Sequence, residues 1–194
     1  MKRIIALSVL AVLLFVQCAK EKDPFFISND TVGHLTIGMK IKHIDSIFAA
    51  DSIVRLNPRQ DEFSTIGEVE IYEKGGKKLM LISPKGNSDP EALISNFQFF
   101  DSRYKTDKGL NPGSTFKDIK DNYTIANIET TISTIALFLE DSDIYINIDK
   151  KELPENLRYN PNFVIEAVNI PDEAKIKYFE LYWDIDSLET PEKE

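Results

Sequence analysis

The feature that most constrains the fold of this chain is a short segment that occurs twice, 75 residues apart. The residues from Gly38 to Phe48 and from Gly113 to Tyr123 share a leading glycine, a lysine four positions later and an isoleucine two positions after that lysine. Further apolar side chains fall at helical spacing in both copies, as in a short amphipathic helix. The sequence therefore predicts a structural turn at Gly38 and at Gly113, each followed by a helix.

A second correspondence, at an offset of 82 residues, relates Glu91–Phe100 to Glu173–Tyr182, and both segments have the aromatic and aliphatic content of strands. Further strand candidates lie between each helix and the matching segment: Ser52–Leu56, Gly67–Tyr72 and Lys78–Ser83, then Thr124–Ile128, Thr131–Leu139 and Ile144–Ile148. The pair Gly75-Gly76 predicts a hairpin turn, and Asp141-Ser142-Asp143 occupies the corresponding place later in the chain.

These patterns predict an α+β fold made of two tandem helix-plus-antiparallel-strand repeats, forming one domain or a packed pair. The first repeat covers residues 31–103 and the second covers residues 104–186. A unit of this size buries only about 60% of its extended surface, so we expect the two to share a sheet or to pack together. Residues 187–194 are expected to be a disordered tail.

The N-terminus has the pattern of an export signal. Lys2 and Arg3 precede an apolar run from Ile4 to Val16, which is too short for a spanning helix and fits a secretory signal peptide over residues 1–17. Cys18, the only cysteine, follows directly, so we expect it to be lipidated and residues 18–30 to form a lipidated tether. The alternative is a free, buried cysteine, and Gln17 stands where a lipoprotein signal normally has a small residue.

Composition and charge exclude several classes of protein. Hydrophobic residues make up 42% of the chain, which is enough for a packed core. The net charge of −9 becomes −11 when Lys2 and Arg3 leave with the signal peptide. A balance this acidic argues against general nucleic-acid binding, which needs a basic surface.

Sequence motifs for catalysis are missing, so we expect no catalytic residue, no metal site and no cofactor. His34 and His43 are the only histidines, and too few other ligands cluster with them for zinc. The Asp141-Ser142-Asp143 segment lacks the glycine and oxygen ligands of an EF-hand loop, and Asp184-Ile185-Asp186 fits a solvated tail better than a cation site. A carboxylate pair for hydrolysis stays open as an alternative, although nothing selects one pair.

Aromatic residues gather in the two related strand segments, and alternation along a strand places every second ring on the outer face of a sheet. The residues concerned are Phe97, Phe99, Phe100 and Tyr104 in the first segment and Tyr178, Phe179, Tyr182 and Trp183 in the second. Outward rings would form a sugar-binding or protein-binding face, whereas inward rings would only fill the core. Both interpretations remain open at this point.

Four tripeptides combine an aspartate, a hydroxyl residue and an aliphatic residue. They contain Thr31, Ser46, Ser52 and Ser187, and they resemble the acceptor motif of an extracytoplasmic O-glycosylation system of Gram-negative gut bacteria. Thr31, near the tether, and Ser187, in the tail, are the possible O-glycosylation sites.

The order of these features resembles that of uncharacterised two-repeat extracytoplasmic lipoproteins of Gram-negative gut bacteria. The resemblance rests on the leader, Cys18, the two glycine-turn-helix units and the joining segment from Tyr104 to Thr115. More distantly, the segments at Gly38 and Gly113 resemble the repeat of the β-lactamase-inhibitor-protein fold and of SmpA/OmlA-type lipoproteins. The resemblance implies an interaction module and transfers no functional residue.

The sequence as a whole predicts a lipid-anchored binding or envelope-assembly protein without catalytic activity. Its expected location is the cell envelope, as an outer-membrane lipoprotein facing the periplasm or the exterior. Its expected partners are the membrane, through the N-terminal lipid, and another envelope protein or a glycan. One alternative is an inhibitor of a secreted enzyme that inserts a loop, either Asn87–Glu91 or Lys150–Pro171. The other alternative is a carboxylate-based hydrolase.

Overall fold

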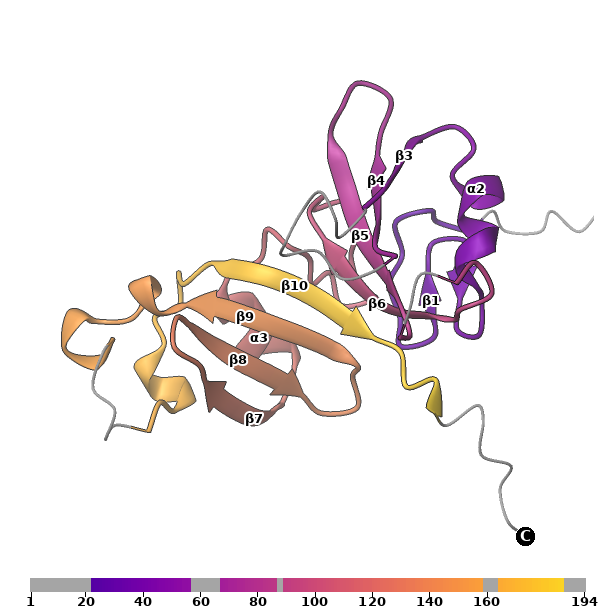
Figure 1. Cartoon of the computed structure of the whole chain (residues 1–194). Helices are drawn as coiled ribbons and strands as arrows, with labels where there is room; N and C mark the ends of the chain where they lie inside the picture. Colours follow the sequence, from indigo (N-terminus) through magenta and orange to yellow (C-terminus); the bar gives the residue numbers. More distant parts are fainter. Residues whose placement is uncertain (1–21, 57–66, 87–88, 159–163, 187–194) are drawn as a thin grey trace, which may run out of the picture.

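The computed structural model describes residues 22–56, 67–86, 89–158 and 164–186, and its centre is one eight-stranded antiparallel sheet (Figure 1). The strand order is β3-β4-β5-β6-β10-β9-β8-β7. The strands are β3 (Ser52–Arg55), β4 (Val69–Tyr72), β5 (Lys78–Pro84), β6 (Ile94–Phe99), β7 (Ile125–Thr130), β8 (Thr134–Leu139), β9 (Ile144–Asp149) and β10 (Ile176–Tyr182). Two runs of four consecutive strands therefore meet where β6 pairs with β10.

Smaller elements surround this sheet. They are the two-stranded pair β1 (Thr31–Val32) and β2 (Leu35–Thr36), the helices α2 (Ile44–Ile47) and α3 (Phe116–Asn122), and the 3₁₀ turns Ile41–His43, Lys150–Glu152, Glu155–Leu157 and Ala167–Asn169. In Figure 1, β7 to β9 run nearly across the direction of β4 and β5, as expected from the accumulated twist of a large sheet.

The expected α+β class, with two helix-plus-strand repeats, is wrong, because the described chain is a β-rich fold dominated by antiparallel sheet. The two α-helices have only four and seven residues. At the first site the apolar stripe forms a 3₁₀ turn and a single helical turn, and Lys40 provides no side-chain cap. At the second site Thr115 and Asp118 form a capping box, which supports two turns of helix. The same apolar spacing is therefore found in helical turns that are too short to form a helical layer beside the sheet.

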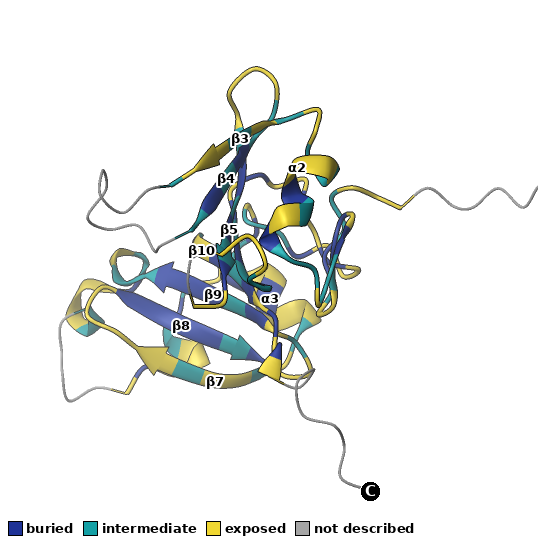
Figure 2. Ribbon diagram, turned by 45° about the vertical axis from the view of Figure 1, so that its right-hand side comes forward, coloured by how far each residue is buried: buried dark blue, intermediate teal, exposed yellow. Residues whose placement is uncertain are grey.

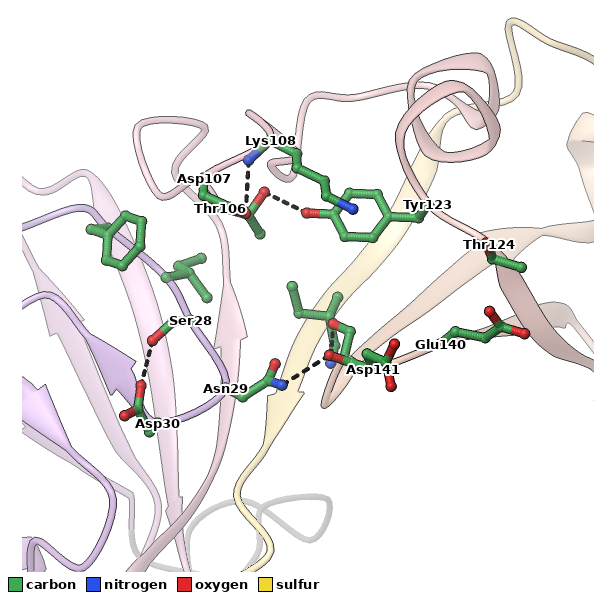
Figure 3. A pocket seen from close by; sticks show the side chains of 14 residues that line it. Ser28, Asn29, Asp30, Thr106, Asp107, Lys108, Tyr123, Thr124, Glu140 and Asp141 are labelled. Carbon is green, nitrogen blue, oxygen red and sulfur yellow. Dashed lines mark hydrogen bonds between the residues drawn. The ribbon is translucent and has the colours of Figure 1, made fainter.

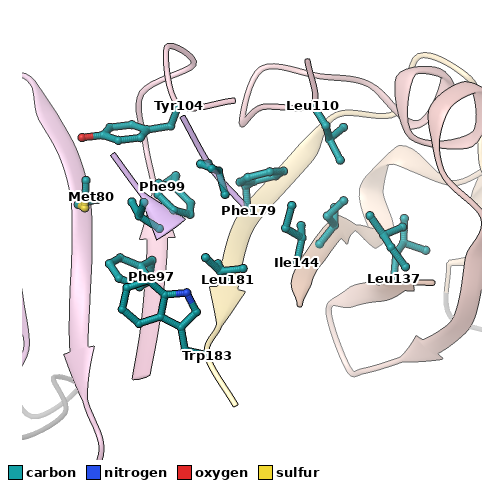
Figure 4. Close-up of a cluster of buried hydrophobic side chains, with 14 of the residues drawn as sticks. Met80, Phe97, Phe99, Tyr104, Leu110, Leu137, Ile144, Phe179, Leu181 and Trp183 are labelled. Atoms are coloured by element: carbon teal, nitrogen blue, oxygen red, sulfur yellow. The ribbon is translucent and has the colours of Figure 1, made fainter. Parts of the chain in front are cut away.

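The core lies on one face of the sheet, where every strand contributes an apolar side chain to a continuous cross-strand row. That row is Ile53, Ile71, Met80, Phe99, Phe179, Ile146, Leu137 and Ile128. Figure 4 shows the rings of Phe97, Phe99 and Phe179 packed in the middle of this layer. Each fully buried side chain of this size contributes about 1.5–3 kcal/mol. The short helices, the β1–β2 pair and the long loops add the remaining buried apolar side chains.

The strand candidates from the sequence overlap the observed strands, including β6 and β10 in the two related segments. Gly75 and Gly76, with φ of 114° and 91°, form the turn between β4 and β5. Asp141, with φ of 54°, lies in the turn between β8 and β9. Figure 2 shows that burial is concentrated in the central strands, whereas the edge strands β3 and β7 carry exposed residues.

Candidate binding face and aromatic hollow

The second face of the sheet, opposite the core, also carries a row to which every strand contributes. This row consists of Val54, Glu70, Leu81, Gln98, Glu180, Tyr145, Phe138 and Asn127. Strand alternation places the next residue on each strand opposite its core neighbour, so these side chains point away from the core. We call this surface the open face.

Four large apolar side chains on or bordering the open face are more than 40% exposed. Val54 and Phe100 are each 43% exposed, Tyr178 is 41% exposed and Tyr182 is 48% exposed. Tyr178 and Tyr182 lie on β10 and follow its alternation, while Phe100 directly follows the buried Phe99. Of the aromatic residues whose orientation the sequence left open, these three point outward, whereas Phe97, Phe99, Tyr104, Phe179 and Trp183 belong to the core.

At the β4–β5 side of the open face, the charges are paired within the protein. Glu70 accepts hydrogen bonds from Lys78 Nζ and, at 2.7 Å, from Tyr72 Oη. Burial alone would raise the pKa of Glu70, but these bonds outweigh it and hold the pKa below its ordinary value. Lys78 Nζ also lies 4.2 Å from the centre of the Phe100 ring. The charged groups at this corner, Glu70 and Lys78, therefore already have partners within the protein.

The middle of the open face differs, because it holds a half-buried carboxylate that has no cation beside it among the described residues. Glu180 lies between Gln98 and Tyr145 in the cross-strand row, and its one described polar contact is a 3.4 Å hydrogen bond from Asn147 Nδ2. Burial raises the pKa of the Glu180 carboxyl, and the bond from Asn147 opposes only part of that rise.

Beyond Glu180, where β9 begins and β10 ends, the protein forms a hollow of about 510 Å³. The Tyr145 ring centre is 5.0 Å from that of Phe138 and 6.0 Å from that of Tyr182, and the second pair meets edge to face. The hollow is lined by Phe138, Ser142, Asp143, Ile144, Tyr145, Tyr182, Trp183 and Asp184. We call it the aromatic hollow.

Two carboxylates border the aromatic hollow. Burial, and secondarily the charge of Asp184, raises the pKa of Asp143 above its ordinary value. Asp143 also fixes the strand ends, because its carbonyl accepts a 3.1 Å hydrogen bond from the Tyr182 amide. The result is a pocket with aromatic walls and a negative rim.

A separate pocket of about 480 Å³ lies between the N-terminal segment, α3 and the β8–β9 turn (Figure 3). Asn29 Nδ2 donates to the Asp141 carbonyl at 3.0 Å, and Asn29 Oδ1 accepts from the Asp143 amide at 3.2 Å. Tyr123 Oη donates to Thr106 Oγ1 at 2.7 Å. The polar groups named here are hydrogen-bonded within the protein, and the bonds of Asn29 hold residues 26–30 against the turn between β8 and β9.

The site residues expected from the sequence lie in different places. Cys18 and Ser187 lie outside the described residues. Thr31 lies in β1, half-buried, and its Oγ1 donates to Asp30 Oδ1 at 3.2 Å. Gly38 has φ of 87° in the turn before Met39, whereas Gly113 lies in a turn without a positive φ.

The two loops considered for enzyme inhibition are largely held by the fold. Within Lys150–Pro171, Leu153, Ile165 and Ile170 are buried, and residues 159–163 lie outside the described part. In the loop ending at Glu91, residues 87–88 are likewise not described. Hydrogen bonds from Lys42 and Lys40 lower the pKa of Glu91 to about 2.

Metal-binding clusters and membrane-spanning helices are both absent from the part of the chain that the structure describes. These residues contain no group of three or more His, Cys, Asp or Glu side chains placed to hold a metal. His43 Nδ1 instead accepts the Lys40 amide at 3.0 Å. None of the helices between residues 22 and 186, where they are described, has the length and apolar content to cross a bilayer.

Two aromatic residues that line the hollow, Phe138 and Tyr145, were not predicted from the sequence as part of a site. The outward orientation of Tyr145 was readable from the alternation in Ile144–Asp149. Phe138 lies in the nearly continuous apolar run of Thr134–Leu139, which gives no such signal. Their proximity to Tyr182 could not be predicted from the sequence, because it depends on the pairing of β10 with β9.

Comparison with known proteins relates the chain to others by fold alone. No protein-family model matches it, and neither does any of the curated proteins. Among solved structures it is similar to the uncharacterised protein yfeY from Escherichia coli, with a TM-score of 0.52 and 18% sequence identity. The match covers 80% of this chain and 98% of the yfeY chain. At this identity the likeness shows a shared fold and carries no activity across.

Proposed function

We propose that this chain is a lipid-anchored, non-catalytic binding protein of the cell envelope, and that it contacts a partner protein with the open face. The proposal for the anchor rests on the apolar run that ends at Cys18. The proposal for binding rests on one observation, the exposed rings on the sheet face that does not serve the core.

The size of the open face suits a protein partner. Eight strands about 4.8 Å apart span roughly 34 Å, and a strand of six residues is about 20 Å long. This gives roughly 700 Å², comparable to the ~800 Å² that each partner contributes to an ordinary stable interface. Tyrosine and phenylalanine, which stand out on this face, are enriched at interface centres. Membrane anchoring raises the local concentration of the partner, so a modest affinity suffices.

Site-specific photocrosslinking in cells that naturally make the protein tests where it binds. A photoreactive residue replaces Tyr178 on the open face or, as a matched control, the exposed Glu155 on the 3₁₀ turn Glu155–Leu157. We expect one discrete protein adduct from position 178 and none from position 155. Equal labelling from both positions, or an adduct that carries only glycan, would refute a protein partner at this face.

Lipidation is tested separately with labelled palmitate and the Cys18→Ser variant. We expect the wild-type protein to incorporate label and to sediment with membranes, and the variant to lose both properties. A Cys18→Ser protein that stays with the membrane fraction as the wild type does would contradict the anchor.

A further inference from the structure

We infer that the aromatic hollow receives one positively charged side chain, a lysine or an arginine, from the partner protein. This inference rests on the proposed function, because it names the chemistry that the open face recognises. It also places the centre of the contact at the Asp143 end of the open face, and not at the corner where Glu70 is paired with Lys78.

Ring geometry supports a cation as the occupant. The centres of Phe138 and Tyr182 lie 5.0 Å and 6.0 Å from that of Tyr145, so a group placed among them is within reach of more than one ring. The face of an aromatic ring is negative and attracts a cation within about 6 Å of its centre. The protein uses the same contact internally, where Lys108 Nζ lies 4.4 Å from the centre of the Tyr123 ring.

Charge supports the same conclusion. The residues that line the aromatic hollow include Asp143 and Asp184 but no lysine, arginine or histidine. Two other carboxylates with reduced exposure have cations beside them: Asp101 has Arg103 at 2.7 Å and Asp149 has Lys177 at 2.9 Å. Within the described residues Asp143 forms no such ion pair. A cation entering the hollow would supply the missing partner.

Trp183 provides a spectroscopic probe beside the hollow, while its ring belongs to the core. The ring is only 3% exposed and packs edge to face on Phe97, with 4.6 Å between the ring centres. In Figure 4 its nitrogen is turned toward Leu181. Because Trp183 directly follows Tyr182 in the chain, a cation bound against the Tyr182 ring changes the surroundings of the indole.

Trp183 is the only tryptophan, so the tryptophan fluorescence of the protein comes from this position beside the hollow. The full-length protein in detergent is titrated with acetyl-Gly-Lys-Gly-amide, with the arginine peptide, and with the norleucine peptide, which matches the lysine chain without its charge. We expect saturable changes with the first two peptides and at least roughly fivefold weaker binding of the norleucine peptide.

Variants locate the binding site. Tyr182→Leu and Asp143→Asn should each weaken lysine-peptide binding by roughly threefold to tenfold, with unchanged circular dichroism. The matched controls are Tyr178→Leu, which removes an exposed ring from the same strand, and Asp107→Asn, which removes an exposed carboxylate outside the hollow. Both controls should bind as the wild type does. Equal binding of the norleucine peptide, or normal binding by Tyr182→Leu, would overturn the inference.

The outcomes separate this inference from the proposed function. If position 178 crosslinks to a protein but lysine peptides do not bind, the open face is a docking surface and the cation site is wrong. If lysine peptides bind at the hollow but crosslinking is equal from positions 178 and 155, the cation site stands and the docking surface is wrong.

Discussion

Asp101 gives the sharpest test of the fold energetics, because it is a charged residue with a fully buried side chain. It directly follows the end of β6 and Phe100, and its carboxylate accepts from Arg103 Nε at 3.0 Å, Arg103 Nη2 at 2.7 Å and Lys77 Nζ at 2.9 Å. The Arg103 amide donates to the second oxygen at 2.9 Å. The Asp101→Asn variant keeps the shape of the side chain and removes its charge.

The expected loss follows from burial. Breaking a buried pair costs about 3–5 kcal/mol when the remaining charge is also buried. Here the side chains of Arg103 and Lys77 are 40% and 58% exposed, so water solvates both cations after the change. We therefore expect Asp101→Asn to lower the free energy of unfolding by about 2–3 kcal/mol and the melting temperature by roughly 5–10 °C.

Urea denaturation followed by Trp183 fluorescence measures this loss at pH 7. The matched control is Asp45→Asn, which breaks the exposed ion pair with Arg55 and should cost less than about 0.5 kcal/mol. Although burial works against it, bonding to Arg103 and Lys77 holds the pKa of Asp101 well below its ordinary value. Its stabilisation is thus complete above about pH 4 and declines as the pH falls through the folded-state pKa. A loss below about 0.5 kcal/mol, or one that grows in acid, would refute this reasoning.

Two further changes test other parts of the structure. Gly33→Ala should destabilise the protein by more than about 1 kcal/mol in the same urea assay, because φ there is +56° and an added Cβ would meet the Pro24 carbonyl oxygen at 2.3 Å. An unchanged denaturation midpoint would contradict the position of residues 24–33. Glu180→Gln should be more stable than the wild type at pH 8, because burial raises the pKa of Glu180 and its ionised form therefore weakens the fold. This advantage should disappear near pH 4, as denaturation midpoints at the two pH values will show, and a variant that is destabilised at pH 8 would count against a burial penalty.

Local patterns in the sequence predicted the strands well and the fold class poorly. Alternation and β-branched content are properties of each strand, and the positive φ of Gly75 and Gly76 is a property of a single turn. The apolar stripe after Gly38 is satisfied equally by a long helix or by one turn, and tertiary packing selected the short form. A longer helix would need a cap that Lys40 does not supply.

The candidate site shows the same division. Exposure of Phe100, Tyr178 and Tyr182 follows from their alternation with buried neighbours, so these rings were predictable. The aromatic hollow requires Tyr182 to lie near Tyr145, which is far away in sequence and separated from it by Lys150–Pro171. No periodicity encodes which strand lies beside which, so that contact became visible only in three dimensions.

The central position of β10 has a consequence for how the chain acquires its structure. This strand is the last of the eight in chain order, yet it pairs with β6 on one side and β9 on the other. Until residues 176–182 arrive, both neighbours present bare edges that invite pairing with other chains. Assembly of the whole sheet therefore has to wait for the last of its eight strands, and a truncation that removes β10 would leave two separate, aggregation-prone sheets instead of a smaller version of the protein.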